Sequence, residues 1–473
     1  MTTLLWLRDD LRLTDHEALS ASSDDARAHD GCVVALWIRE QLPDSAEPGL
    51  GARPLGARPL GAASRWWTHR SLAELAPRLA ELGIPLLFTR GDPREIVPRV
   101  AHALGASTVR WSRRYAPGAR ALDAMVKSAV LQSGIRAHSH PGALLVEPWL
   151  VSTASGGHYS VFTPFHRAAA AVPTGPLRAV PSLLPEPDAA IRDAMARLAA
   201  DRVTCSLDEL GLLDHSPPWW RDTVEQHWCP GELAALERLD RTNTWLGSYA
   251  TSRDLPADPD STSRLSPHLR SGEISPRTLL LAAQGRSLPS KDVTAWVRQL
   301  YWREFCWHLT YHVPNLRHRP LRQRFEDFPY QESPELLRAW QRGHTGIDLV
   351  DAGMLELWHT GWMHNRVRMV TASLLTKNML QPWWLGEQWF WDTLVDADEA
   401  NNPVQWQWVA GCGADAAPYF RVFNPDLQAR RHDPDNRYIG RWLSLREPGG
   451  ITPVVDLAES RRAALEAYEI IRD

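Results

Sequence analysis

The segment Trp358–Pro425 decides how the rest of the chain is interpreted: WHTGWMHNRVRMVTASLLTKNMLQPWWLGEQWFWDTLVDADEANNPVQWQWVAGCGADAAPYFRVFNP. Its tryptophans stand among arginines, asparagines and acids. A packed core does not need so many indoles, because each is bulky and carries an N–H that must find a partner. A Trp-rich helical core is one interpretation. The other is a site where stacked aromatic rings handle a flat ring system, a base or electrons.

One helix of this segment carries an unusual mixture of side chains. Trp362, Arg366 and Met369 are spaced i, i+4 and i+7, so they share one helix face, and Asn365 and Arg368 lie beside it. An indole, an amide, a guanidinium and a thioether on adjoining faces are an odd mixture for a core. They suit a pocket that holds an aromatic molecule with hydrogen-bonding edges.

Two other segments supply charge and hydroxyl groups. The acids and amides of Asp396–Asn402 would pair with the arginines, since a buried guanidinium needs such a partner, although an exposed acidic loop fits this run equally well. Upstream, Thr262, Ser263 and Ser266 cluster with Arg264 at a predicted helix start. Hydroxyls and free backbone N–H groups there can bind a pyrophosphate, while a plain N-cap also explains each hydroxyl alone.

The first 140 residues alternate short apolar runs with amphipathic stretches, which predicts an α/β domain with a doubly wound, mostly parallel sheet. We expect strands at Leu4–Leu7, Cys32–Ile38, Pro85–Thr89 and Thr108–Trp111, and a weaker one at Ala143–Val146. No GxGxxG follows the first strand. We therefore do not expect a dinucleotide bound to this sheet in the Rossmann manner.

The chain divides into three predicted parts. Residues 1–140 form the α/β domain, residues 141–213 a connector with weak periodicity, and residues 214–473 an all-α domain that includes helices at Asp292–Tyr311 and Met363–Lys377. The repeat LGARPLGARPLGA (Leu50–Ala62) is most simply an exposed loop that tolerated an insertion.

Composition describes an ordinary globular protein of 473 residues with 23% charged residues and a formal net charge of −4. The five cysteines are scattered without a CxxC pair, which favours a reducing cytoplasm and disfavours structural zinc or an iron–sulfur cluster. No apolar run has membrane-spanning length, and the N-terminus has no signal-peptide pattern. Of the 52 basic residues only Lys127, Lys291 and Lys377 are lysines. This bias can reflect codon usage, yet a local basic groove for nucleic acid stays allowed.

Taken together, the motifs resemble the DNA photolyase/cryptochrome family, in its microbial class I-like cyclobutane-dimer photolyase branch. The resemblance covers nearly the whole chain. It runs through WLRDDLRLTDHEAL, GDPREIVPRVAHALGA, SGGHYSVFTPF, TSRLSPHLRSGEIS, LYWREF, TGWMHNRVRMVTASLLTK and NNPVQWQWVAGCGADAAPYFRVFNP. It implies an α/β antenna domain and a helical domain that binds FAD in a bent conformation. That would explain the missing GxGxxG.

The resemblance also assigns residues to the cofactor. The FAD phosphate region would be held by Tyr249, Thr262, Ser263, Arg264, Leu265 and Ser266. Arg368 would pair with Asp396 near the isoalloxazine ring, and Asp398 would contact the flavin or the adenine end. Asn402 matches the residue that faces flavin N5.

UV-damaged DNA is the implied partner, and the protein is expected to be a monomer. A flipped-out pyrimidine dimer would lie against Gln299, Trp302, Arg303, Asn365, Arg366, Met369 and Trp408. Enzymes that act on a base take it out of the stack, and a damaged pair stacks poorly. Excited reduced FAD would pass one electron to the dimer, and the ring would split.

Three positions depart from the family pattern. The electron-relay tryptophans match Trp406 and Trp383, but the outer position is Tyr330, which must lose a proton when it is oxidised. The glutamate that contacts the dimer in many relatives is Gln299, which can donate a hydrogen bond but supplies neither a proton nor a charge.

The third departure concerns the antenna chromophore. The folate-contacting Cys-Lys pair corresponds to Arg317 and His318, and the glutamate after Tyr115 is Ala116. A deazaflavin is therefore favoured over methenyltetrahydrofolate, with another flavin or an empty site also open.

The main alternative function is a cryptochrome-like blue-light photoreceptor that binds FAD but repairs little or nothing. Such a receptor is expected to carry a C-terminal extension or a changed flavin-facing residue. Here Asn402 is retained and the chain ends soon after its last predicted helix. HNRVRM lacks the second histidine expected for repair of (6-4) lesions.

Overall fold

The N-terminal sheet is built around β1 (Thr2–Leu7), whose six residues are all buried. The computed structural model describes residues 1–42, 56–214, 216, 218–285, 289–415, 420–446 and 450–472. The strands follow the order β3-β2-β1-β4-β5, and every neighbouring pair is parallel. The other strands are β2 (Cys32–Glu40), β3 (Leu86–Gly91), β4 (Ala106–Ser112) and β5 (Arg136–His140).

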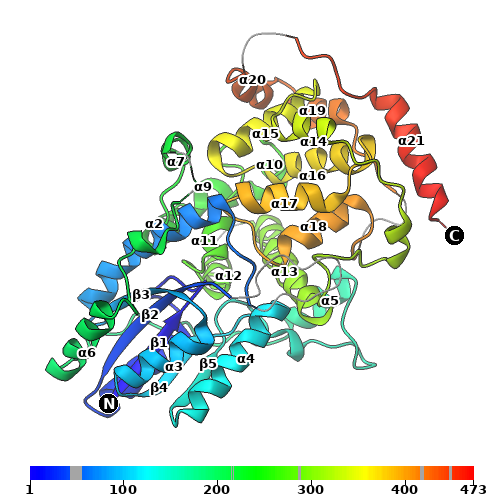
Figure 1. The fold of residues 1–473 in the computed structure, drawn as a ribbon. Coiled ribbons are helices and arrows are strands. Elements are labelled where there is room, and N and C mark those ends of the chain that lie inside the picture. The colour runs from blue at the N-terminus through cyan, green and yellow to red at the C-terminus, as the bar shows by residue number, and fades with distance from the viewer. Residues whose placement is uncertain are drawn as a thin grey trace.

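Helices cover both faces of this sheet (Figure 1). Leu5 and Leu7 of β1 pack with α1 (Glu17–Ala28) and α2 (Ala62–Glu81). On the other face, the alternate β1 residues pack with α3 (Pro93–Ala103), α4 (Pro117–Gln132) and α6 (Ala189–Ala200). This arrangement confirms the predicted doubly wound parallel sheet. The central strands are covered on both faces, which explains the continuous apolar runs in their sequences.

The fifth strand lies elsewhere than predicted. Ala143–Val146 is not a strand, and the edge position is taken by the polar segment Arg136–His140. An edge strand needs only one hydrogen-bonded neighbour, so it can be polar. The apolar residues Leu145 and Val146 are nevertheless buried, without strand pairing. Their backbone N–H groups donate to the Glu304 carboxylate at 2.8 and 3.2 Å.

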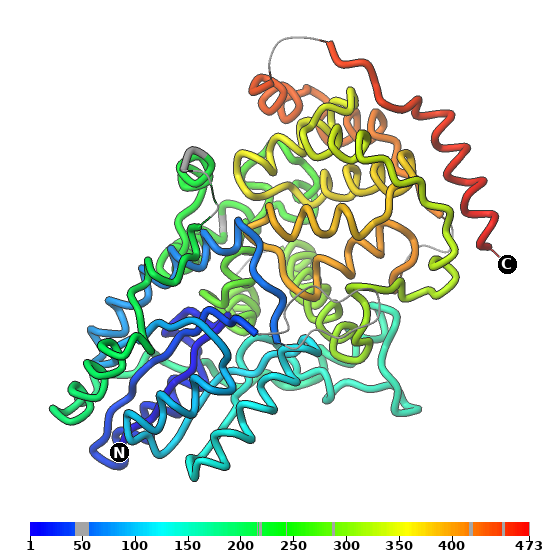
Figure 2. The backbone as a smooth tube through the Cα atoms, viewed as in Figure 1, coloured from blue at the N-terminus to red at the C-terminus, as the bar shows by residue number. Residues whose placement is uncertain are grey.

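The connector between the domains contains more helix than its sequence indicated. It includes η1 (Pro148–Leu150), α5 (Phe162–Ala170), α6 and η2 (Asp208–Leu210). Figure 2 shows the chain leaving the sheet, running along the helical domain and returning to the α/β domain. Phe162 and Phe165 of α5 pack into the helical core, whereas α6 packs on α3.

The rest of the chain is helical, and its elements form two cores. The helices are α7 (Pro218–Glu225), α8 (Glu232–Asp240), α9 (Thr242–Leu246), α10 (Tyr249–Ser252), α11 (Ser266–Arg270), α12 (Pro276–Gln284), α13 (Ser290–His312), η3 (Gln323–Asp327), α14 (Pro334–Gln341), α15 (Asp348–Thr360), α16 (Asn365–Ser373), the π-helical turn η4 (Leu374–Asn378), α17 (Trp383–Thr393), α18 (Asn401–Ala410), α19 (Pro425–His432), α20 (Arg437–Leu443) and α21 (Leu457–Ile470). One core gathers α5, α8, α12 and α13. The other gathers α14 to α17, α20 and α21. Among the helices of the described ranges, none is long and apolar enough to cross a membrane.

The described half of the repeated GARPL segment corrects the loop prediction. Arg58 is buried, although Leu50–Ala62 was expected to be an exposed insertion. The segment packs on the helical domain, since Trp391 Nε1 donates to the Pro59 carbonyl at 2.9 Å. Residues 50–55 lie outside the described residues.

Candidate functional site

An open cavity of about 1460 Å³ lies between α13 and the helices α16 and α18. Its walls therefore come from both helical cores. Most of the residues assigned to FAD or to the lesion line it: Tyr249, Ser263, Leu265, Ser266, Gln299, Trp302, Arg303, Asn365, Arg368, Met369, Asp396, Asp398 and Trp408. Thr262, Arg264 and Arg366 are not among its lining residues.

A deeper cavity of about 560 Å³ continues from the first and is lined by Asn402 and Trp406. The two share Asn365, Arg368 and Asp396. Phe390 and Trp406 meet edge to face, with ring centroids 4.9 Å apart. A flat polar-edged ring fits this lobe, because its wall is aromatic on one side and lined by amides on another.

Asp396 is the central acid of the cavity. Its Oδ2 accepts hydrogen bonds from Arg368 Nη2 at 2.8 Å and from Ser266 Oγ at 2.7 Å. Its Oδ1 is buried without a partner in the described structure. A buried carboxylate oxygen without a donor is costly. A ligand that presents an N–H to Asp396 Oδ1 would remove that cost, and the flavin ring system carries such groups.

Arg264 lies behind the cavity wall with its guanidinium between two indoles. Its Cζ is 4.6 Å from the Trp228 ring centroid and 4.9 Å from that of Trp362. Burial lowers the pKa of Arg264 from its ordinary value. The Nε atom has no hydrogen-bond acceptor in the described structure. An unsatisfied buried cation beside hydroxyl-bearing Ser263 and Ser266 fits a phosphate group.

Three of the residues assigned to the lesion lie on the α13 wall: Gln299, Trp302 and Arg303. Trp302 stacks on Phe162 with centroids 3.7 Å apart, so its ring is held flat. Gln299 donates to the Ala295 carbonyl at 3.1 Å. Arg303 donates to the Ala143 carbonyl at 3.0 Å, which joins this wall to the connector.

Arg366 points away from the main cavity. Its Nη2 lies 2.7 Å from Asp254 Oδ2. The predicted helix face shared by Trp362, Arg366 and Met369 is wrong for Trp362, because α16 begins only at Asn365 after its N-cap His364. Arg366 and Met369 do lie on α16, and Arg366 Nη1 approaches the Met369 sulfur at 3.9 Å. Its place is consistent with the cavity rim rather than with the floor.

The aromatic residues assigned to electron transfer follow α18 and α17 toward the surface. A Cβ on Gly386 would lie 2.2 Å from Trp406 Cη2, so only glycine lets the Trp406 ring lie against α17, where Trp383 begins the helix. Trp383 meets Trp384 at 5.9 Å, and Tyr330 meets Trp384 edge-on at 5.3 Å. The structure therefore adds Trp384 between Trp383 and Tyr330.

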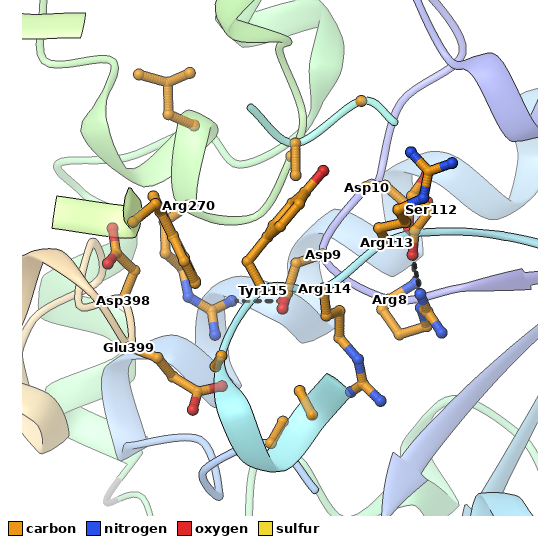
Figure 3. Close-up of a pocket in the computed structure, with 18 of the residues that line it drawn as sticks. Arg8, Asp9, Asp10, Ser112, Arg113, Arg114, Tyr115, Arg270, Asp398 and Glu399 are labelled. Atoms are coloured by element: carbon orange, nitrogen blue, oxygen red, sulfur yellow. Dashed lines mark hydrogen bonds and ion pairs between the residues drawn. The ribbon is translucent and has the colours of Figure 1, made fainter. Parts of the chain in front are cut away.

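A second, highly charged cavity of about 850 Å³ opens at the carboxyl ends of β1 and β4. Figure 3 shows Tyr115 at its centre, with Arg8, Asp9 and Asp10 following β1 on one side and Asp398 and Glu399 on another. The sheet order reverses between these two strands, which is where open α/β sheets bind ligands. Asp398 lines both cavities, so one loop separates them.

Sequence reasoning missed three residues around Asn402. Gln405 lines both lobes of the main cavity. Glu387 accepts a hydrogen bond from Asn402 Nδ2 at 2.7 Å, and Arg58 pairs with Glu387 at 2.6 Å. Glu387 lies on α17 and Gln405 on α18, two helices that the sequence did not predict, and neither residue belongs to a distinguishing motif. Arg58 was hidden because Gly and Pro neighbours indicate a surface loop.

Comparison with known families defines the class of protein. Residues 3–187 match the DNA photolyase family model, and residues 296–447 match the model described as the FAD binding domain of DNA photolyase. The chain is thus a flavoprotein that joins an α/β domain to a helical FAD-binding domain.

Individual relatives narrow this class. A deoxyribodipyrimidine photo-lyase of Agrobacterium fabrum is 39% identical, over 99% of this chain and 98% of its own. A bacterial class III photolyase structure from Agrobacterium tumefaciens has a TM-score of 0.85 at 37% identity, covering 99% of this chain and 97% of its own. A photolyase from Sulfolobus tokodaii, solved with two FAD molecules, has a TM-score of 0.80 at 25% identity, covering 99% of this chain and 100% of its own. The chain belongs to the DNA photolyase family.

Proposed function

We propose that this protein repairs cyclobutane pyrimidine dimers in DNA with blue light and uses FAD as its cofactor. The observation that carries the proposal is the two-lobed cavity, whose lining unites the residues assigned to FAD with those assigned to the lesion. Reduced FAD, when bound and excited by light, supplies one electron that splits the cyclobutane ring and then returns to the cofactor. The protein supplies position, charge and exclusion of water.

FAD fits the polar atoms that the cavity leaves without partners. Asp396 Oδ1 and Arg264 Nε supply one acceptor and one donor. We assign the phosphate region to Tyr249, Thr262, Ser263, Arg264, Leu265 and Ser266, and the ring system to Arg368, Asp396, Asp398 and Asn402. Of these, neither Thr262 nor Arg264 lines the cavity. Thr262 has the weaker support of the two, because Arg264 offers a buried Nε without a partner in the described structure.

The lesion would occupy the outer lobe against Trp302 and Trp408. Both are large planar side chains on α13 and α18 that can stack on the flipped bases. Gln299, Asn365 and Met369 would contact the edges of the flipped bases. Arg303 and Arg366 would interact with the negatively charged phosphates of the DNA backbone. Trp406, Trp383 and Tyr330 would carry electrons to FAD when it has to be reduced.

The second cavity supports a site for an antenna chromophore. It lies in the α/β domain at the sheet's switch point and contacts the main cavity through Asp398. We favour a deazaflavin over methenyltetrahydrofolate because Ala116, Arg317 and His318 replace the family's folate contacts. Because the Sulfolobus tokodaii relative was solved with two FAD molecules, another flavin is the competing occupant of this second cavity. Absorption of the purified protein from the near-UV to the blue distinguishes them.

Several further assignments rest on the same reasoning. We place the domain limits at residues 1–140, 141–213 and 214–473, since every described strand lies before residue 141. The five free cysteines support a cytoplasmic location. We expect a monomer. The class I-like branch remains a sequence-based prediction, and a class III photolyase is among the similar structures.

One experiment tests the function. Purified protein with reduced FAD is mixed with an oligonucleotide that carries a cyclobutane dimer and is exposed to blue light or kept dark. We expect loss of the dimer only in light, and stronger binding to this oligonucleotide than to its undamaged copy. FAD-loaded protein that removes no dimer in light would instead favour the photoreceptor function.

A further inference from the structure

A buried ion pair joins the repeated GARPL segment to the wall of the flavin lobe. Arg58 Nη1 lies 2.6 Å from Glu387 Oε1, and the side chains are only 4% and 2% exposed. The guanidinium also lies over the Trp391 ring, 4.1 Å from its centroid. Burying either charge alone would be costly. The guanidinium balances the Glu387 carboxylate, a group that accepts hydrogen bonds and donates none.

Glu387 fixes the direction of the Asn402 amide. Asn402 Nδ2 donates to Glu387 Oε1 at 2.7 Å and to the Glu387 carbonyl at 3.0 Å. A side-chain amide has two N–H donors, so both are used. Because neither acceptor can donate, the reversed amide would place oxygen against oxygen. The Asn402 oxygen is thus the atom left for the lobe that Asn402 lines.

We propose that Arg58 is a positioning residue for the redox chemistry of FAD. By holding the Glu387 carboxylate against the Asn402 amide, it turns the Asn402 oxygen toward the flavin, where an acceptor would favour a ring nitrogen that carries a proton. The inference rests on the proposed placing of FAD in this lobe. It gives the α/β domain a part in flavin chemistry that is separate from light harvesting.

Loss of the Arg58 charge should weaken this orientation of the Asn402 amide. Without Arg58, nothing balances the buried Glu387 carboxylate, so it is no longer held against Asn402. Only the Glu387 carbonyl then fixes the direction of the Asn402 amide, and the Asn402 oxygen is held toward the lobe less firmly. Bound FAD that has accepted one electron would therefore hold its added proton less firmly.

The test compares variants of the FAD-loaded protein by absorption after uptake of one electron, which distinguishes protonated from unprotonated flavin. In Arg58→Met we expect the ratio of unprotonated to protonated flavin to rise roughly threefold to tenfold, the effect of losing one hydrogen bond. Arg58→Lys keeps the charge and should restore most of the wild-type ratio. Arg446→Met is the matched control, because it removes the partner of the buried Asp351 at another site and should leave the ratio unchanged.

A double variant keeps the proposal testable if Arg58→Met does not fold. Arg58→Met/Glu387→Met replaces the ion pair by apolar side chains, which proteins often tolerate, and it should show the same rise. Wild-type ratios in both Arg58→Met and the double variant, with FAD bound, would overturn the positioning role. Wild-type protein that binds no FAD would instead refute the proposed function.

Discussion

Among the residues assigned to electron transfer, Tyr330 differs in chemistry from the two tryptophans. It packs edge-on against Trp384 at 5.3 Å, and burial raises the pKa of its phenol well above the ordinary value. An oxidised tyrosine must release its proton, and burial makes that release harder. We expect Tyr330→Phe to slow photoreduction of bound FAD several-fold, while repair by chemically reduced protein stays at the wild-type rate. Absorption recorded after timed periods of illumination measures both the photoreduction rate and the repair rate.

The control for this prediction is Tyr311→Phe, which alters a tyrosine stacked under Arg120 beside the antenna domain. It should leave photoreduction unchanged. Equal photoreduction in wild type and Tyr330→Phe would remove Tyr330 from the electron path. A matching loss in Trp384→Phe would support the route through Trp384.

Gln299 gives a second prediction at this scale. Its amide lines the outer lobe and is held by a 3.1 Å hydrogen bond to the Ala295 carbonyl. If it donates to a pyrimidine carbonyl, Gln299→Ala should weaken binding of dimer-containing DNA about fivefold, which corresponds to ~1 kcal/mol. Binding of the undamaged copy serves as the control and should not change. Unchanged affinity and repair yield for damaged DNA would show that the assigned contact is wrong.

At the scale of elements, sequence periodicity predicted the central strands and helices such as α13, but neither the sheet edge nor α17 and α18. The run Leu4–Leu7 needs both faces covered, so its apolar sequence identifies it. Arg136–His140 carries no such pattern, because an edge strand is defined by its neighbour β4 rather than by its own side chains. The error at Ala143–Val146 has the same origin, since those backbone groups are satisfied by Glu304 on α13, far away in sequence.

The candidate site, like the fold, could be predicted only in part from the sequence. Residues in long motifs, such as Arg368 and Asp396, were identified and lie 2.8 Å apart. Arg58 and Glu387 could not be paired from the sequence, because their partnership depends on how one domain docks on the other. Long-range pairing of buried charges leaves no local pattern.

The docking of α13 on the connector predicts a pH effect. Burial raises the pKa of Glu304 to about 7, above its ordinary value of 4.5. Between these values the folded protein holds a proton that the unfolded chain has lost, so stability falls as pH rises through this window, by at most about 1.4 kcal/mol per pH unit. Glu304→Gln should flatten this part of the profile. Denaturant unfolding of FAD-saturated protein measures it, and an unchanged slope in the variant would exclude Glu304 as the cause.

At the scale of the whole molecule, buried charges hold the two domains together. Arg12 donates to the carbonyls of Gly272 and Gly142 at 2.9 and 3.0 Å. Glu232 accepts from the backbone N–H groups of Leu13 and Thr14, both at 2.8 Å. These contacts link the loop after β1 to the helical domain, so the cavity at the ends of β1 and β4 and the main cavity keep a fixed relation. We expect the domains to unfold in one transition.

The most strongly paired of these charges provides the test. Asp15 is fully buried and accepts from Ser275 and from Arg277, whose Nη2 lies 2.6 Å from Asp15 Oδ1. Arg277→Met leaves this carboxylate without its cation, which costs on the order of 3 kcal/mol. Circular dichroism and FAD release should therefore shift to lower temperature together. Arg241→Met, at the exposed pair with Glu237, should shift neither. If Arg277→Met lowered the helical signal but not FAD release, the domains would unfold separately and the single transition would be wrong.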